Sequence, residues 1–207
     1  MIASMDTTQV TRGFLLYFML PLWIGAGLAD WICHRVSQIE KTSGTRESLI
    51  HTLMLTEAGI AMLAGLLLQI NALIIALMLV AYLAHEATAM WDVRYASAHR
   101  RLMPIEQNIH SFLDMIPLMA VSFVIILHWQ DFLSLFGMGL KVADFSIRKK
   151  IGAVPSFEYT AGFLAVAVAL VEIPYAEELL RCLRANRLRL RVATPGSESS
   201  GTAFTVD

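Results

Sequence analysis

Five long apolar runs constrain the fold of this chain more than any other feature of its sequence. Each run approaches the roughly 20 residues that an α-helix needs to cross the hydrocarbon core of a bilayer. They cover residues 13–32, 49–70, 72–91, 105–129 and 156–175. Hydrophobic residues make up 57% of the chain and charged residues only 16%, whereas soluble domains carry roughly 25% charged residues. The sequence therefore predicts an all-α integral membrane protein with five transmembrane helices.

The first four runs predict an up-down four-helix bundle built from two similar hairpins. The turn between the second run and the third covers only residues 69–71, so these two runs form a tight antiparallel pair. We divide the chain into an N-terminal segment (1–12), the bundle with its candidate site (13–130), a linker along the outer membrane interface (131–155), a fifth helix with a basic extension (156–193) and a disordered tail rich in Ser, Gly and Thr (194–207).

The placement of Lys and Arg predicts the orientation in the membrane. Eleven of the 16 basic residues fall on one side, in the loops after the first and third runs and in the C-terminal extension, and five fall on the other. Because cytoplasmic loops carry an excess of Lys and Arg, we expect a bacterial inner-membrane protein with its N-terminus outside and its C-terminus in the cytoplasm. The alternative is that the first run is a cleaved signal peptide. Only one basic residue, Arg12, precedes that run, which argues against cleavage.

Several classes of function are excluded by the composition and the motifs. A net charge of −1 argues against a nucleic-acid partner. Cys33 and Cys182 have no ligand spacing, and the chain carries no nucleotide-binding glycine loop and no nucleophile elbow.

Carboxylates and histidines gather where the first four runs reach the predicted cytoplasmic face. One unit reads Asp30-xxx-His34, a polar loop and Glu47-xxx-His51, and the other reads Asp92, His99, a polar loop and Glu106-xxx-His110 followed by Asp114. Residues at positions i and i+4 share one face of a helix. Ionisable side chains within membrane segments are costly and mark functional sites.

Inward-pointing carboxylate and histidine pairs in a four-helix bundle are a known way to hold two metal ions. We expect direct ligands among Asp30, His34, Glu47, His51, Asp92, His99, Glu106 and His110, with His85, Glu57 and Asp114 as additional or outer ligands and Glu86 orienting an imidazole. Two iron ions are the expected cofactor, and zinc or manganese suit the same donors. Haem is not favoured, because axial ligation of haem does not need the nearby carboxylates. A polar network or proton path without metal is the alternative.

The ligand layout within residues 30–114 resembles that of the di-iron carboxylate proteins, including membrane-bound oxidases of the alternative-oxidase kind. That family uses Glu-x-x-His, whereas this chain has Glu47-Ser-Leu-Ile-His51 and Glu106-Gln-Asn-Ile-His110. The resemblance therefore implies a type of metal site and not membership of the family.

These patterns predict an oxidoreductase that acts on a lipid-soluble substrate such as a lipid or a quinol. A metal-dependent lipid hydrolase is a close variant, and an accessory or assembly subunit of a larger membrane complex is the non-enzymatic alternative. Arg94, Arg100 and Arg101 are candidates to bind an anionic substrate, although the positive-inside pattern also accounts for them. Residues 181–191 contain five Arg residues interleaved with Leu, which predicts a basic helix on anionic lipid.

Overall fold

Helices account for nearly all of the regular structure in this protein. The computed structural model describes residues 6–150 and 155–193. Within these two ranges the chain forms helices, turns and one isolated bridge between Leu68 and Lys149, without a strand. The predicted disordered tail lies outside the described residues, as do residues 151–154 of the predicted linker.

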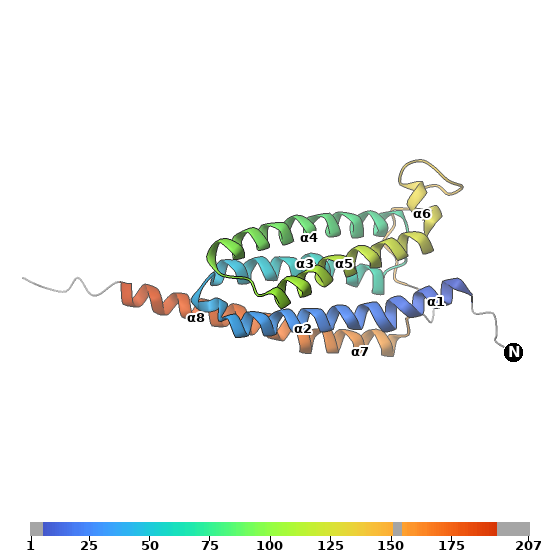
Figure 1. Cartoon of the computed structure of the whole chain (residues 1–207). Helices are drawn as coiled ribbons and strands as arrows, with labels where there is room; N and C mark the ends of the chain where they lie inside the picture. The colour runs from blue at the N-terminus through green and yellow to red at the C-terminus, as the bar shows by residue number, and fades with distance from the viewer. Residues whose placement is uncertain (1–5, 151–154, 194–207) are drawn as a thin grey trace, which may run out of the picture.

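Four long helices are apolar enough to cross a membrane, which confirms the predicted membrane-helix character (Figure 1). The first spans Thr7–Ser37 and consists of α1 (Thr7–Phe14), the π-helical turn η1 (Leu15–Met19) and α2 (Leu20–Ser37). The others are α3 (Thr45–Leu67), α4 (Ala72–His99) and α5 (Pro104–Leu127). Most of the residues in each apolar stretch are not buried inside the protein, as expected for helices that face lipid.

A fifth long helix completes the bundle. It runs without a break through α7 (Phe157–Ala167), the π-helical turn η3 (Val168–Glu172) and α8 (Ile173–Ala193). The main helix contacts form a ring in which α2 meets α5, α5 meets α4, α4 meets α3, and α8 contacts both α3 and α2. The fifth helix thus takes part in the core that sequence analysis assigned to the first four helices. The four helices that meet the membrane criteria do not include it, so its span of the membrane remains a prediction.

Local sequence signals explain where the helices begin and end. The Asn71 side chain caps α4 by accepting a hydrogen bond from the Ile74 amide at 3.1 Å. Pro104 opens α5, where its missing N–H has no intrahelical partner to lose. After α2, Gln38 adopts a left-handed conformation (φ 52°), and the short helix η2 (Ile39–Lys41) and Gly44 (φ 67°) lead into α3. These ends place residues 30–34, 47–51, 92 and 106–110 at one end of the bundle.

The linker after α5 folds back on the opposite end of the bundle. It contains α6 (Trp129–Ser134), and its later part pairs with the turn between α3 and α4. The Gln69 amide donates to the Arg148 carbonyl at 2.9 Å, and the Lys150 amide donates to the Leu67 carbonyl at 2.9 Å. The linker is therefore packed against the helices, and its place at the membrane interface remains a prediction.

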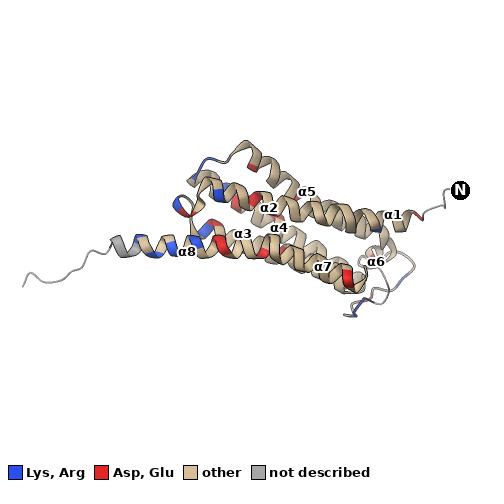
Figure 2. Ribbon diagram, turned by 90° about the horizontal axis from the view of Figure 1, so that it is seen from below, with Lys and Arg blue, Asp and Glu red and all other residues tan. Residues whose placement is uncertain are grey.

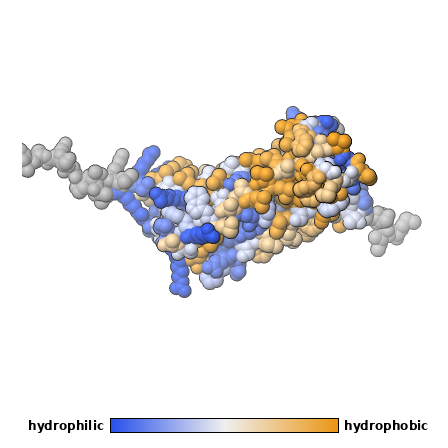
Figure 3. All heavy atoms as spheres, turned by 90° about the horizontal axis from the view of Figure 1, so that it is seen from above, coloured by the Kyte–Doolittle hydropathy of each residue, from blue (hydrophilic) through white to orange (hydrophobic). Residues whose placement is uncertain are grey.

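The surface separates apolar from charged regions along the bundle. Large apolar side chains such as Val80, Leu83 and Ile126 are more than half exposed, and Figure 3 shows a broad hydrophobic surface toward the α1 and α6 end. Lys and Arg gather instead along α8 and the loops at the other end, whereas the middle of the bundle carries few charges (Figure 2). This distribution suits a bilayer around the apolar region.

Candidate metal centre

One buried cluster brings together seven of the predicted site residues and one that sequence analysis missed. We call it the carboxylate–histidine cluster, and it consists of Asp30 and His34 on α2, Glu47 and His51 on α3, Asp92 on α4, Glu106 and His110 on α5, and Glu178 on α8. All of these residues except His110 are at most 4% exposed. Such burial of acids and imidazoles is costly unless each finds a partner.

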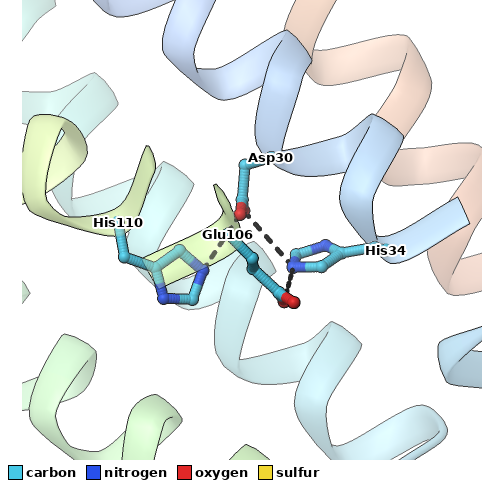
Figure 4. A group of neighbouring side chains, drawn as sticks. All are labelled: Asp30, His34, Glu106 and His110. Atoms are coloured by element: carbon cyan, nitrogen blue, oxygen red, sulfur yellow. Dashed lines mark ion pairs between the residues drawn. The ribbon is translucent and has the colours of Figure 1, made fainter. Parts of the chain in front are cut away.

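The α2 and α5 helices face each other with one acid and one histidine each (Figure 4). The four-residue spacing puts Asp30 and His34 on one face of α2, and Glu106 and His110 on one face of α5. His34 Nε2 lies 3.4 Å from Asp30 Oδ2 and 3.6 Å from Glu106 Oε1. His110 Nε2 lies 2.9 Å from Asp30 Oδ1. One possible ligand atom from each of the four residues falls within 4.8 Å of the others.

A second group forms beside the first from α2, α3 and α4. His51 Nε2 lies 3.3 Å from Asp92 Oδ1 and 3.9 Å from Glu47 Oε1. Ligand atoms of His34, Glu47 and His51 also lie within 4.8 Å of one another. The two groups share His34, so the cluster is continuous and contains donors for more than one ion.

Glu178 connects the two groups from the fifth helix. Its two oxygens each lie 3.0 Å from an imidazole Nδ1, Oε2 from that of His34 and Oε1 from that of His51. The two rings stack with centroids 4.3 Å apart and an angle of 4° between their planes. Tyr175, one turn earlier, donates its hydroxyl to Asp30 Oδ2 at 2.7 Å. Sequence analysis missed both residues because their helix contains no histidine to mark it as part of a site.

The geometry of the two stacked rings disfavours a positive charge on both imidazoles at once. Two positive charges 4.3 Å apart would repel by about 4 kcal/mol at an effective dielectric constant of about 20. In a neutral ring, Nδ1 carries the proton and donates to Glu178, and Nε2 presents a lone pair. Neither the His34 nor the His51 Nε2 has a hydrogen-bond partner, although carboxylate oxygens lie 3.3–3.9 Å away. Acceptors that face one another in a buried site could hold a cation between them.

Arg100 is the one cationic side chain that the described structure places among these acids. Its Nε lies 3.0 Å from Glu47 Oε1, and its Nη1 lies 3.0 Å from Glu106 Oε2. Burial by itself lowers the pKa of Arg100, but the hydrogen bonds to Glu106 and Glu47 raise it above its ordinary value. The cluster contains five carboxylates, and Arg100 contributes one positive charge. Its net charge is therefore −4 if the carboxylates are ionised and the imidazoles are neutral. Two divalent cations would offset that charge.

The remaining predicted residues lie outside the cluster. His99 is exposed at the end of α4 and stacks on Tyr95 with a centroid distance of 4.1 Å. Arg94 and Arg101 are exposed, and Arg100 is occupied by Glu47 and Glu106 and is not free for an anionic substrate. Farther along the bundle lie the other acids and histidine, namely Glu57, His85, Glu86 and Asp114.

His85 and Glu57 have partners of their own. His85 Nδ1 lies 3.3 Å from the Met54 carbonyl oxygen, and Thr88 donates its hydroxyl to Glu57 at 3.0 Å. Neither residue belongs to the groups whose ligand atoms converge. Comparison with known protein families, with curated proteins and with solved structures finds no match for this chain.

Proposed function

We propose that the carboxylate–histidine cluster is a two-metal centre and that the protein is a membrane oxidoreductase. The observation that carries this proposal is the pair of stacked imidazoles whose Nδ1 atoms meet Glu178 while their unpartnered Nε2 atoms face carboxylates. In metal sites, a histidine usually donates its other ring N–H to a carboxylate, which fixes the tautomer and orients the ring. Here one carboxylate does this for two histidines.

The donors fit two ions of the first transition series. One group offers Asp30, His34, Glu106 and His110, and the other offers Glu47 and His51 with Asp92 beside them. Oxygen and imidazole donors of this mixture suit iron, manganese or zinc. We favour two iron ions because inward-pointing carboxylates and histidines on several helices of a bundle resemble the di-iron type of site.

The side chains around the centre would prepare it for chemistry on a lipid-soluble substrate. Two bound iron ions would supply electron transfer. Glu178 holds the histidine rings, Tyr175 holds Asp30, and Arg100 limits the repulsion between Glu47 and Glu106. The surrounding apolar helices exclude water from the site. The positive-inside pattern places this end of the bundle at the cytoplasmic face.

Metal analysis of the full-length protein purified in detergent tests the proposal. We expect about two ions per chain, the number held by bundle sites built from inward-pointing carboxylates and histidines. His51→Ala and Asp30→Ala should reduce that number. His99→Ala is the matched control, because His99 is exposed and outside the cluster, and it should leave the metal content unchanged. Circular dichroism checks that each variant keeps its helices.

The outcomes separate the candidate functions. Iron together with oxidation of a lipid-soluble donor supports the oxidoreductase. Zinc with hydrolysis of a lipid ester would replace it with the hydrolase, and tightly bound metal without turnover in a stable complex with larger partners would favour the accessory subunit. Metal at background level in the wild-type protein would contradict the two-metal centre. The cluster would then be a polar network or proton path without metal.

A further inference from the structure

A large cavity lies between α2, α3, α4 and α5. Its volume is about 850 Å³, within the range of roughly 300–1,000 Å³ that is typical of small-molecule sites. Apolar side chains such as Leu20, Ala81 and Val121 form much of its wall. It extends from the polar residues at the α6 end of the bundle to Glu57 and His85, about midway along α3 and α4.

A second, smaller cavity of about 100 Å³ adjoins the first and reaches the cluster. The two cavities share Trp23, Ala58, Met62 and His85 in their walls. Asp30 and His51 line the smaller one. His85 therefore stands between the space inside the bundle and the candidate metal centre.

Each of the two polar side chains at this junction has one atom without a hydrogen-bond partner. His85 is 6% exposed, and its Nδ1 lies 3.3 Å from the Met54 carbonyl oxygen, which can only accept a hydrogen bond. In the neutral ring Nδ1 then carries the proton, and Nε2 is an acceptor. Neither His85 Nε2 nor Glu57 Oε2 has a hydrogen-bond partner. A hydrocarbon chain alone would leave both acceptors unsatisfied, which is costly in a buried site.

We propose that this cavity binds an amphiphile with a hydroxylated head group, such as a quinol, with its hydroxyl groups at His85 and Glu57 and its apolar chain along α2 and α5. The inference rests on the proposed function, because it names the substrate class of the same centre. The head group must donate hydrogen bonds, so the site discriminates against a molecule of the same shape that can only accept them. A binding site that depends on buried hydrogen bonds rejects such analogues strongly.

A matched pair of ligands tests the inference on the purified full-length protein. The probes are a benzoquinol with a decyl chain and its dimethyl ether, which keeps the ring and chain but has no hydroxyl donor. Binding is followed by tryptophan fluorescence, since Trp23 lines both cavities, and Trp23→Phe identifies the reporter. We expect the quinol to bind at least tenfold more tightly than the ether, because two acceptors lose their donors.

Two variants with controls locate the site. His85→Phe should reduce the preference for the quinol, because only the Glu57 acceptor remains, whereas His99→Phe at the exposed end of α4 should keep it. Ala120→Phe puts a ring into the cavity and should weaken binding of both ligands at least tenfold. Val80→Phe is its control, because Val80 is 65% exposed on the outer face of α4.

Equal affinity for quinol and ether in the wild-type protein would overturn the inference and show an apolar cavity that any lipid fills. An unchanged preference in His85→Phe, or unchanged binding in Ala120→Phe, would also overturn it. Metal content is measured on the same samples. Selective quinol binding by a protein without metal would reject the two-metal centre while the binding site stands.

Discussion

At the residue scale, the two nitrogens of each imidazole have different roles. In His34 and His51 the Nδ1 atoms meet Glu178, and the Nε2 atoms face carboxylates. A ring held this way has one defined tautomer and one directed lone pair. Glu178 contacts both rings at once. It is not a member of either group of converging ligand atoms, so it acts on them through His34 and His51.

Glu178→Gln should therefore weaken metal binding without removing any direct ligand. The amide keeps the size of the side chain but loses the charge that orients both N–H groups, and loss of such an orienting partner lowers metal affinity by about 10- to 100-fold. Competition with a chelator of known affinity measures the change. Glu177→Gln is the control, because Glu177 pairs at the surface with Arg35 and Arg181. Equal affinity in the two variants would show that Glu178 does not orient the site.

At the scale of the helices, close packing of the fifth helix against α2 brings Glu178 to the cluster. Gly27 on α2 faces Val171 on η3, and a Cβ atom at Gly27 would lie 3.5 Å from a Val171 methyl group. The Tyr175 hydroxyl, which donates to Asp30, also lies 3.3 Å from the Gly27 carbonyl oxygen. Small residues at such positions let membrane helices approach closely.

Gly27→Leu should separate the two helices and destabilise the fold. The contact tolerates a methyl group but has no room for an isobutyl side chain, and such overpacking costs about 1–3 kcal/mol. Thermal unfolding in detergent measures the loss. Gly25→Leu should have little effect, because nothing lies within 4 Å of a Cβ atom at that position. If both variants unfolded at the same temperature, the close approach of α2 and η3 would not contribute to stability.

At the scale of the whole molecule, the candidate metal centre lies at the end of the bundle from which α8 projects. The basic residues also gather at that end, and the linker after α5 folds against the other (Figures 1 and 2). If this charge asymmetry sets the orientation, the centre lies near the cytoplasmic face and the α6 end of the large cavity lies toward the outer half of the bilayer.

Cysteine labelling in intact cells tests this orientation. A membrane-impermeant maleimide should label Met138→Cys in the linker, whereas Arg187→Cys on α8 should react only after the membrane is opened. Both positions are exposed. The native thiols give little background because both are buried, and burial together with the Glu178 carboxylate raises the pKa of the Cys182 thiol to about 12. Labelling with the reverse pattern would invert the proposed topology.

Much of the helical architecture and part of the candidate site follow from the sequence alone. Hydropathy predicts the four long apolar helices because a bilayer requires apolar runs of a certain length. The four-residue spacing of acids and histidines predicts shared helix faces, and seven of the predicted residues do converge. These are local properties, so a linear pattern is enough to reveal them.

Only the tertiary structure decided which polar groups meet. His99 and Asp92 lie seven residues apart on one helix, yet Asp92 reaches His51 and His99 remains exposed, because the cluster lies deeper in the bundle than the end of α4. Glu178 and Tyr175 come from a helix with no histidine, and they join the site only through the packing of that helix against α2 and α3. Arg100, which follows the positive-inside pattern, turns inward to Glu47 and Glu106. Contacts between helices distant in sequence depend on how side chains fill the space between them, and periodicity along one helix does not encode that.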